Sequence, residues 1–270
     1  MPRRLSILAG SGTLVSHVIE AAQRAGDQVQ VIALTPQPER AGVQLLQGDT
    51  RDPMSIVQTI KAFRSTHVTL AGGVTLGDRA REGLSQFAGG SAASAGDAAL
   101  SRMSGVVRAM TGAKVIGAHE VAKDLLAPKG MIAGPVLTDA QGRTAQLALK
   151  AAREIGRLDL GQAVVAAGAR VVAAEDVGGT DELLQRVAEH RRQGRIGDGA
   201  GPLVLAKAAK PKQPLSIDLP AVGPDTVAKA AEAGITVIVV EPGRVLLLDR
   251  PALIAAAEQH GITIIGLARV

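Results

Sequence analysis

Three lysines follow a short apolar run in the second half of the chain, at Lys207, Lys210 and Lys212, and Asp218 comes shortly after them. Lysine ammonium groups donate hydrogen bonds to phosphate oxygens, and a carboxylate can hold Mg²⁺ or orient a water molecule. Phosphoryl chemistry requires this mixture of side chains. The same residues also fit another interpretation, in which the lysines lie in a solvated loop and Asp218 caps a turn before Pro220.

Two glycine-rich segments each follow an apolar run, and their residues are Gly10, Ser11 and Gly12 in the first and Gly72, Gly73 and Val74 in the second. Small residues let backbone N–H groups approach a phosphate or a sugar. Both turns are expected at the carboxyl edge of one parallel sheet, where together they form a crevice. Turns that only end a strand are the alternative.

The first turn is an incomplete dinucleotide fingerprint. Val15 stands where the third glycine is expected, and the next strand ends in Leu34, Thr35 and Pro36 rather than in an acidic ribose ligand. Contact with a nucleotide and a purely structural turn therefore both remain open.

Familiar metal-binding patterns are missing from the sequence. The five histidines form no His-x-His or i, i+4 pair, so a histidine metal site is unsupported. His119, at a predicted strand end, is placed like a site residue, although a partly buried structural histidine is the commoner case. Asp49 and Asp52 superficially match a motif of calcineurin-like phosphoesterases, but the rest of that pattern is absent, so we interpret them as loop and helix-capping residues.

Composition excludes several classes of function. The 270 residues include no Cys, Trp or Tyr and only 2 Phe, and their net charge is +5. Thiol chemistry and disulfides are excluded, which fits a reducing cytoplasm, and nucleic-acid binding by aromatic stacking is not expected. No apolar stretch is long enough to span a membrane. The positive charge favours an anionic partner or membrane surface, or reflects a basic surface without a specific partner.

Apolar runs alternate with helical periods in the order typical of an α/β protein with two domains. Residues 1–125 are predicted to form an N-terminal Rossmann-like domain with a parallel sheet, and 144–270 a C-terminal mixed α/β domain. Residues 126–143, rich in Gly and Pro without a sustained period, are predicted to connect them. The strands are expected at 5–9, 29–34, 67–71, 114–117, 163–165, 170–174, 203–207, 235–240, 244–248 and 262–267, and helices include 144–155 and 181–192.

Taken together, these motifs resemble a known family, the UDP-2,3-diacylglucosamine pyrophosphatase of lipid A biosynthesis, in the form unrelated to calcineurin-like phosphoesterases. The resemblance runs from residues 8–12 to 261–263. Its most specific parts are residues 117–121, 156–162, Glu175 with 179–181, 207–213 and 218–220.

This resemblance implies Mg²⁺-dependent hydrolysis of UDP-2,3-diacylglucosamine to UMP and 2,3-diacylglucosamine 1-phosphate, by water attacking the phosphorus nearer the sugar. It also implies that the acylated substrate binds between two α/β domains. The family's essential aspartate falls on Asp218, which we expect to hold Mg²⁺ or orient water. Asp97 is a candidate second metal ligand, although the family's Gly-Asp-Asp is Gly96-Asp97-Ala98 here.

The remaining expected roles concern substrate contact. Lys207 is expected to act in catalysis and Lys210 to neutralise phosphate oxygens. The two glycine-rich turns are expected to hold uridine or ribose, and His119, Thr180 and Asp181 to contact the substrate.

A diacylated substrate implies a protein that visits the membrane surface, peripheral to the inner membrane on its cytoplasmic side. Three basic residues, Arg191, Arg192 and Arg195, are candidates for attracting anionic lipid. The alternative is that they form an ordinary solvated helix end. A homodimer is also allowed for. Two other classes remain open: a nucleotide-sugar or lipid binding regulator without catalysis, and an NAD(P)-dependent oxidoreductase, which the incomplete fingerprint disfavours.

Overall fold

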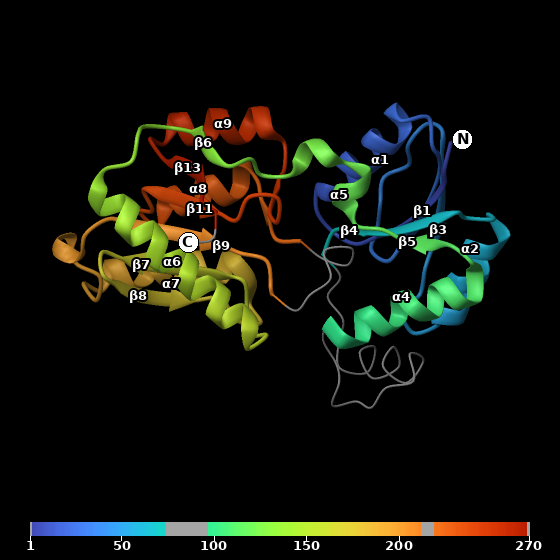
Figure 1. Ribbon diagram of the computed structural model, residues 1–270, viewed down its shortest axis with the longest axis horizontal. Coiled ribbons are helices and arrows are strands. Elements are labelled where there is room, and N and C mark those ends of the chain that lie inside the picture. Colours follow the sequence, from blue (N-terminus) through green and yellow to red (C-terminus); the bar gives the residue numbers. More distant parts are fainter. Residues whose placement is uncertain (1, 74–96, 212–218, 269–270) are drawn as a thin grey trace. The chain divides into compact units, whose positions relative to one another are not determined.

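The computed structural model describes residues 2–73, 97–211 and 219–268. The described residues form two compact units, one up to Asp124 and the other made of residues 125–211 and 219–268 (Figure 1). Each unit has its own sheet, as expected for a two-domain α/β protein.

The first unit is built on a parallel five-stranded sheet in the order β3-β2-β1-β4-β5. Helices α1 and α5 lie on one face and α2 and α4 on the other (Figure 1). The elements are β1 (Arg4–Ala9), α1 (Leu14–Arg24), β2 (Gln28–Ala33), β3 (Val43–Gln47), α2 (Pro53–Ala62), β4 (His67–Ala71), α4 (Asp97–Thr111), β5 (Lys114–Val115) and α5 (Ala118–Val121).

A six-stranded mixed sheet in the order β6-β13-β11-β9-β7-β8 organises the second unit. Strands β9, β11 and β13 are parallel, whereas β6, β7 and β8 pair antiparallel with their neighbours. The elements are β6 (Gly130–Ala133), α6 (Asp139–Arg157), β7 (Ala163–Ala167), β8 (Arg170–Ala174), α7 (Gly179–Arg192), β9 (Leu203–Lys207), β10 (Ala221–Val222), α8 (Pro224–Glu232), β11 (Val237–Val240), β12 (Leu246–Leu247), α9 (Arg250–Gln259) and β13 (Thr263–Gly266), and β10 pairs with β12 in a separate ribbon.

Strand β9 is buried on both faces, and its alternation decides where its last residue points. Leu203 and Leu205 belong to the core that contains apolar residues of α7, α8 and α9. Val204 and Ala206 belong to the opposite core, with residues of α6. Because successive side chains of a strand alternate, Lys207 projects from the face that α7 covers, at the carboxyl end of β9.

The structure differs from the sequence-based prediction at several short elements. Residues 126–143, predicted to connect two domains, contain β6 and the first turn of α6. Helix α6 begins at Asp139, before the predicted Thr144, because Thr138 and Gln141 form a capping box there. Strand β3 and the short helix α5 were not predicted.

Candidate functional site

The two glycine-rich turns of the first unit meet, as expected for turns that follow neighbouring parallel strands. The N–H groups of Gly10 and Ser11 donate to the carbonyl oxygens of Ala71 and Gly73, at 2.8 and 2.7 Å. Gly73 N–H donates in return to Ser11 O at 2.9 Å. The N–H groups of Gly10 and Ser11 are therefore used in hydrogen bonds within the protein. The backbone N–H groups at the start of α1 are the ones in this turn that can contact a ligand.

Gly72 makes this close approach possible. Its φ of +85° lies in the left-handed region, and a Cβ atom built there would lie 2.3 Å from Ser11 O. Only glycine fits such a backbone contact without a shift. Val74, predicted to continue this turn, lies outside the described residues.

The loop after β2 carries a residue that sequence reasoning missed. Gln37 Nε2 donates to Gly10 O at 2.7 Å, so a neutral carboxamide reaches the first glycine-rich turn. A dinucleotide-binding fold places a carboxylate near this position to bind ribose hydroxyls. This part of the first unit therefore disfavours the NAD(P)-dependent alternative.

His119 lies in α5, just beyond the carboxyl end of β5 and on the same sheet edge as both glycine-rich turns. Burial lowers the pKa of its imidazole, and the neighbouring Glu120 carboxylate opposes this effect. Within the described part of the chain, its buried Nδ1 atom has no hydrogen-bond partner. His119 is therefore neutral near pH 7, and its contact with substrate remains a prediction.

In the second unit, Lys207 is the centre of a buried polar chain. Its ammonium Nζ donates to Thr180 Oγ1 at 2.8 Å and to Ala221 O at 3.0 Å. Thr180 Oγ1 in turn donates to Glu175 Oε1 at 2.7 Å. Lys207 and Glu175 are only 7% and 8% exposed. The sequence indicated Lys207 and Thr180 as site residues, and the structure brings them into direct contact.

Two other predicted site residues pair with exposed charges. Lys210 Nζ lies 2.5 Å from Asp159 Oδ1. The Asp181 carboxylate forms an ion pair with Lys229 of α8. Each of these groups therefore has a protein partner in addition to any contact with substrate.

Glu241, which follows β11, belongs to a second cluster of charged side chains next to the Lys207 hydrogen-bond network. Its carboxylate lies 3.4 Å from Arg153 Nε and 3.5 Å from Arg244 Nε, and it is 3% exposed. Glu241 N–H donates to Lys207 O at 3.2 Å, so the two residues are neighbours across the sheet. No motif indicated this cluster, because its members come from a helix and a strand end 88 residues apart.

The described residues contain no compact cluster of metal-binding side chains. No three Asp, Glu or His side chains come together in the described ranges. Asp218 lies outside these ranges, and Asp97 is placed as the first residue of α4 without a described side chain. The two metal ligands expected from the sequence remain predictions.

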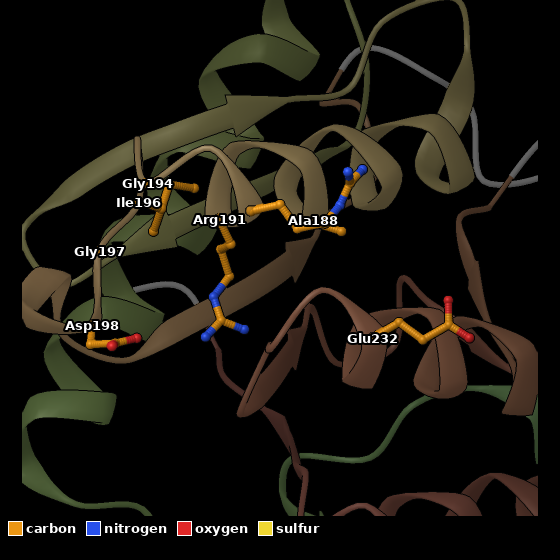
Figure 2. Close-up of a pocket in the computed structure, with 8 residues that line it drawn as sticks. Ala188, Arg191, Gly194, Ile196, Gly197, Asp198 and Glu232 are labelled. Carbon is orange, nitrogen blue, oxygen red and sulfur yellow. The ribbon is translucent and has the colours of Figure 1, made fainter.

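A shallow pocket of about 460 Å³ lies at the other end of α7. Figure 2 shows the Arg191 side chain between those of Asp198 and Glu232. Arg191 follows Thr180 by eleven residues, or about 16 Å along a helix. Arg191 and Arg192 line this pocket together with Asp198 and Glu232, so its charged side chains balance. None of the site residues expected from the sequence lines it.

Two family models match the chain, one for each of the two units. A sequence model described as the LpxI N-terminal domain matches residues 4–125, and one described as the LpxI C-terminal domain matches 128–265. A curated relative, the UDP-2,3-diacylglucosamine pyrophosphatase LpxI of Caulobacter vibrioides, is 41% identical over 162 residues. That alignment covers 58% of this chain and 56% of the relative.

Among solved structures, UDP-glucose 4-epimerase of Thermus thermophilus, in complex with NAD, is 15% identical, with a TM-score of 0.31 over 98% of this chain and 85% of that one. The WbmG enzyme of Bordetella bronchiseptica, in complex with NAD and UDP, is 20% identical, with a TM-score of 0.26 over 33% and 34%. Likenesses this low do not bear on function.

Proposed function

Because the chain belongs to the LpxI family, we propose that it hydrolyses UDP-2,3-diacylglucosamine in lipid A biosynthesis. The products are UMP and 2,3-diacylglucosamine 1-phosphate. The observation that carries this proposal is the match of both domain models, in order, across nearly the whole chain. The identity to the Caulobacter vibrioides pyrophosphatase supports the same substrate.

In this mechanism, a water oxygen attacks the phosphorus nearer the sugar. The bond from that phosphorus to the bridging oxygen breaks, and the bridging oxygen leaves with UMP. Negative charge increases on the transferred phosphoryl group and on the leaving group, so catalysis depends mainly on positioning and on electrostatic stabilisation. Hydrolysis in ¹⁸O-labelled water should place the label in the sugar phosphate, and label in UMP would refute this direction of attack.

The Lys207 ammonium group supplies positive charge to the phosphoryl oxygens. Its burial supports this role, because an ammonium group fixed in a water-poor site stabilises charge better than a solvated one. Lys210 adds a second positive charge, and Asp218 orients the attacking water. Asp181 lies in the first turn of α7, where it approaches the sugar or a phosphate.

The first unit supplies contacts for the nucleotide. The backbone amides that begin α1, after the turn at residues 10–12 and beside Gly72 and Gly73, hold uridine or ribose, and neutral His119 contacts the substrate from the same sheet edge. This binding does not require an acidic side chain that accepts from the ribose hydroxyls, which agrees with the neutral Gln37 in the loop after β2.

Dependence on Mg²⁺ is part of the proposal, with Asp218 and Asp97 as ligands. When bound, the ion would neutralise charge on phosphate oxygens. A chelator should abolish UMP release, and Mg²⁺ added in excess should restore it. Full activity in the presence of chelator would remove the ion from the reaction.

The substrate carries two acyl chains, so we also propose that the protein works at a membrane surface as a peripheral protein. No helix in the described ranges is long and apolar enough to cross a bilayer. Exposed Arg191, Arg192 and Arg195 lie at or after the end of α7, where they can attract anionic lipid. High salt should release the protein from vesicles that contain anionic lipid; retention would contradict an electrostatic attachment.

The decisive experiment is UMP release from UDP-2,3-diacylglucosamine by the purified protein and its Asp218→Ala variant. Turnover should collapse in the variant while substrate binding persists. Asp139→Asn, an exposed carboxylate change in α6, is the matched control and should keep normal turnover. Substrate binding without UMP release by the unaltered protein would instead favour a binding regulator.

A further inference from the structure

The buried chain around Lys207 links three elements through a hydroxyl group. Lys207 ends β9, Thr180 lies in the first turn of α7, and Glu175 directly follows β8. Hydrogen bonds connect the Lys207 ammonium group to the Glu175 carboxylate through the Thr180 hydroxyl. Thr180 Oγ1 lies between them, 2.8 Å from Lys207 Nζ and 2.7 Å from Glu175 Oε1.

The chemistry of these groups fixes the direction of both hydrogen bonds. An ammonium group has donors and no acceptor, so the Thr180 hydroxyl must accept from Lys207. The single hydroxyl proton is then donated to Glu175, whose ionised carboxylate has acceptors and no donor. Glu175 therefore holds the Thr180 hydroxyl with its lone pairs turned toward Lys207.

Glu175 is itself held firmly. Gln162 N–H donates to its second carboxylate oxygen, Oε2, at 2.6 Å. Its backbone N–H donates to Ala163 O at 2.8 Å. A Cβ atom at Gly161 would lie 2.6 Å from Glu175 O, so glycine at that position allows the backbones to pack closely. The carboxylate thus has one orientation in the fold.

This arrangement orients the Lys207 ammonium group. Lys207 Nζ donates to Thr180 Oγ1 and to Ala221 O, and these two directions fix the rotation of a tetrahedral ammonium group. The direction of its third N–H bond is then set as well. Donors that are fixed before the reaction stabilise developing charge without reorganisation.

We infer that Glu175 and Thr180 are positioning residues, which hold the Lys207 ammonium group in the orientation required for pyrophosphate hydrolysis. The inference rests on the proposed function. It assigns a role to Glu175, and it gives the Thr180 hydroxyl a role toward Lys207 in place of direct contact with substrate.

The first test measures how tightly Lys207 is held, independently of activity. Amine acetylation of the whole protein, followed by peptide mass spectrometry, gives the labelling rate of Lys207 relative to exposed Lys150. Glu175→Gln and Thr180→Val should each raise this relative rate several-fold, because Lys207 loses an anchor. Unchanged labelling in both variants would overturn the inference.

The second test measures UMP release. Removing a hydrogen bond to a charged group lowers kcat by about tenfold to a hundredfold when the bond matters for the transition state. We expect this loss for Thr180→Val, with KM changed less than about threefold. Thr180→Ser, which keeps the hydroxyl, should recover most of the activity. Equal losses in the serine and valine variants would contradict a role for the hydroxyl.

A double-variant comparison separates positioning from a general structural effect. In a Lys207→Met background, Thr180→Val should lower the remaining kcat less than about twofold, because the group that it positions is gone. A full additional loss would refute action through Lys207. Thr144→Val is the matched control, since it removes a buried hydroxyl in α6, on the opposite sheet face, that donates to Ala140 O at 3.0 Å.

Failure of the proposed function and failure of the positioning role give different results. If the unaltered protein releases no UMP, the proposed function is wrong, while the labelling rates still decide whether Glu175 and Thr180 hold Lys207. If UMP is released and the labelling and kinetic changes are absent, the proposed function stands and the positioning inference is wrong.

Discussion

Replacing Gly72 by alanine should destabilise the first unit more than the same replacement at Gly12. Both glycines have positive φ, +85° at Gly72 and +96° at Gly12. A Cβ atom at Gly12 would meet nothing within 4 Å, whereas one at Gly72 would lie 2.3 Å from Ser11 O. The two variants therefore share backbone strain, and only Gly72→Ala adds a steric conflict.

The magnitudes follow from these two contributions. An alanine in the left-handed region costs about 1–2 kcal/mol. The conflict at Gly72 also separates Ser11 from Gly73, whose two reciprocal backbone hydrogen bonds contribute about 0.5–1.5 kcal/mol each. The unfolding free energy should fall by about 1–2 kcal/mol for Gly12→Ala and by about 2–5 kcal/mol for Gly72→Ala. The effect of alanine on the unfolded chain is common to both variants.

Hydrogen exchange read by mass spectrometry suits this chain, which has no Trp or Tyr for fluorescence. It also follows each unit separately, which matters because two units need not unfold in one step. Peptides of β1 and β4 should exchange roughly 30-fold to several thousand-fold faster in Gly72→Ala, and about 5-fold to 30-fold faster in Gly12→Ala. Peptides of β9 and β11 are the internal control. An effect of Gly72→Ala no larger than that of Gly12→Ala would refute the reasoning.

Three further predictions concern capping, pH and surface charge. Asp52 caps α2 by accepting from Ser55 N–H, so Asp52→Ala should lower the unfolding free energy of the first unit by about 0.5–2 kcal/mol; unchanged exchange in α2 would contradict this role. Burial lowers the pKa of His119 below its ordinary value of 6.5, so the unfolded chain binds the proton more readily and stability falls as pH decreases below about 6.5. His119→Gln should reduce the fall in thermal midpoint between pH 7.5 and pH 5.5, measured by circular dichroism, and an identical fall would refute this. Asp181→Asn should change stability by less than about 1 kcal/mol, because the ion pair with Lys229 is exposed; a larger loss in urea unfolding would show that the pair is structural.

The α/β class was predictable because strands and helices alternate with strong periods in both halves of the chain. The position of Lys207 followed from the buried run of β9, and the meeting of the glycine-rich turns followed from the geometry of parallel strands. These features depend on local sequence or on general properties of sheets.

The missed elements depend on distant partners. Strand β6 has only four residues, Gly130–Ala133, and is followed by Gly134, and its pairing with β13 joins segments about 130 residues apart. Local turn signals therefore dominated the prediction. The hydrogen bonds among Glu175, Thr180 and Lys207 likewise join separate elements. From the sequence, Glu175 could therefore be recognised as part of a motif, but its role could not be predicted. Asp218 was a candidate from its place after the three lysines, its essential role was assigned from the family resemblance, and it lies outside the described residues.

The antiparallel pairing of β6 with β13 affects how the second unit can be made. Strand β6 leaves the ribosome long before Thr263–Gly266, yet β13 separates it from the rest of its sheet. During synthesis, the β6 segment therefore has no strand to pair with until residues 263–266 of β13 have been translated. A nascent chain stalled before that point should leave this segment open to proteases or chaperones, and completion of translation should close the sheet.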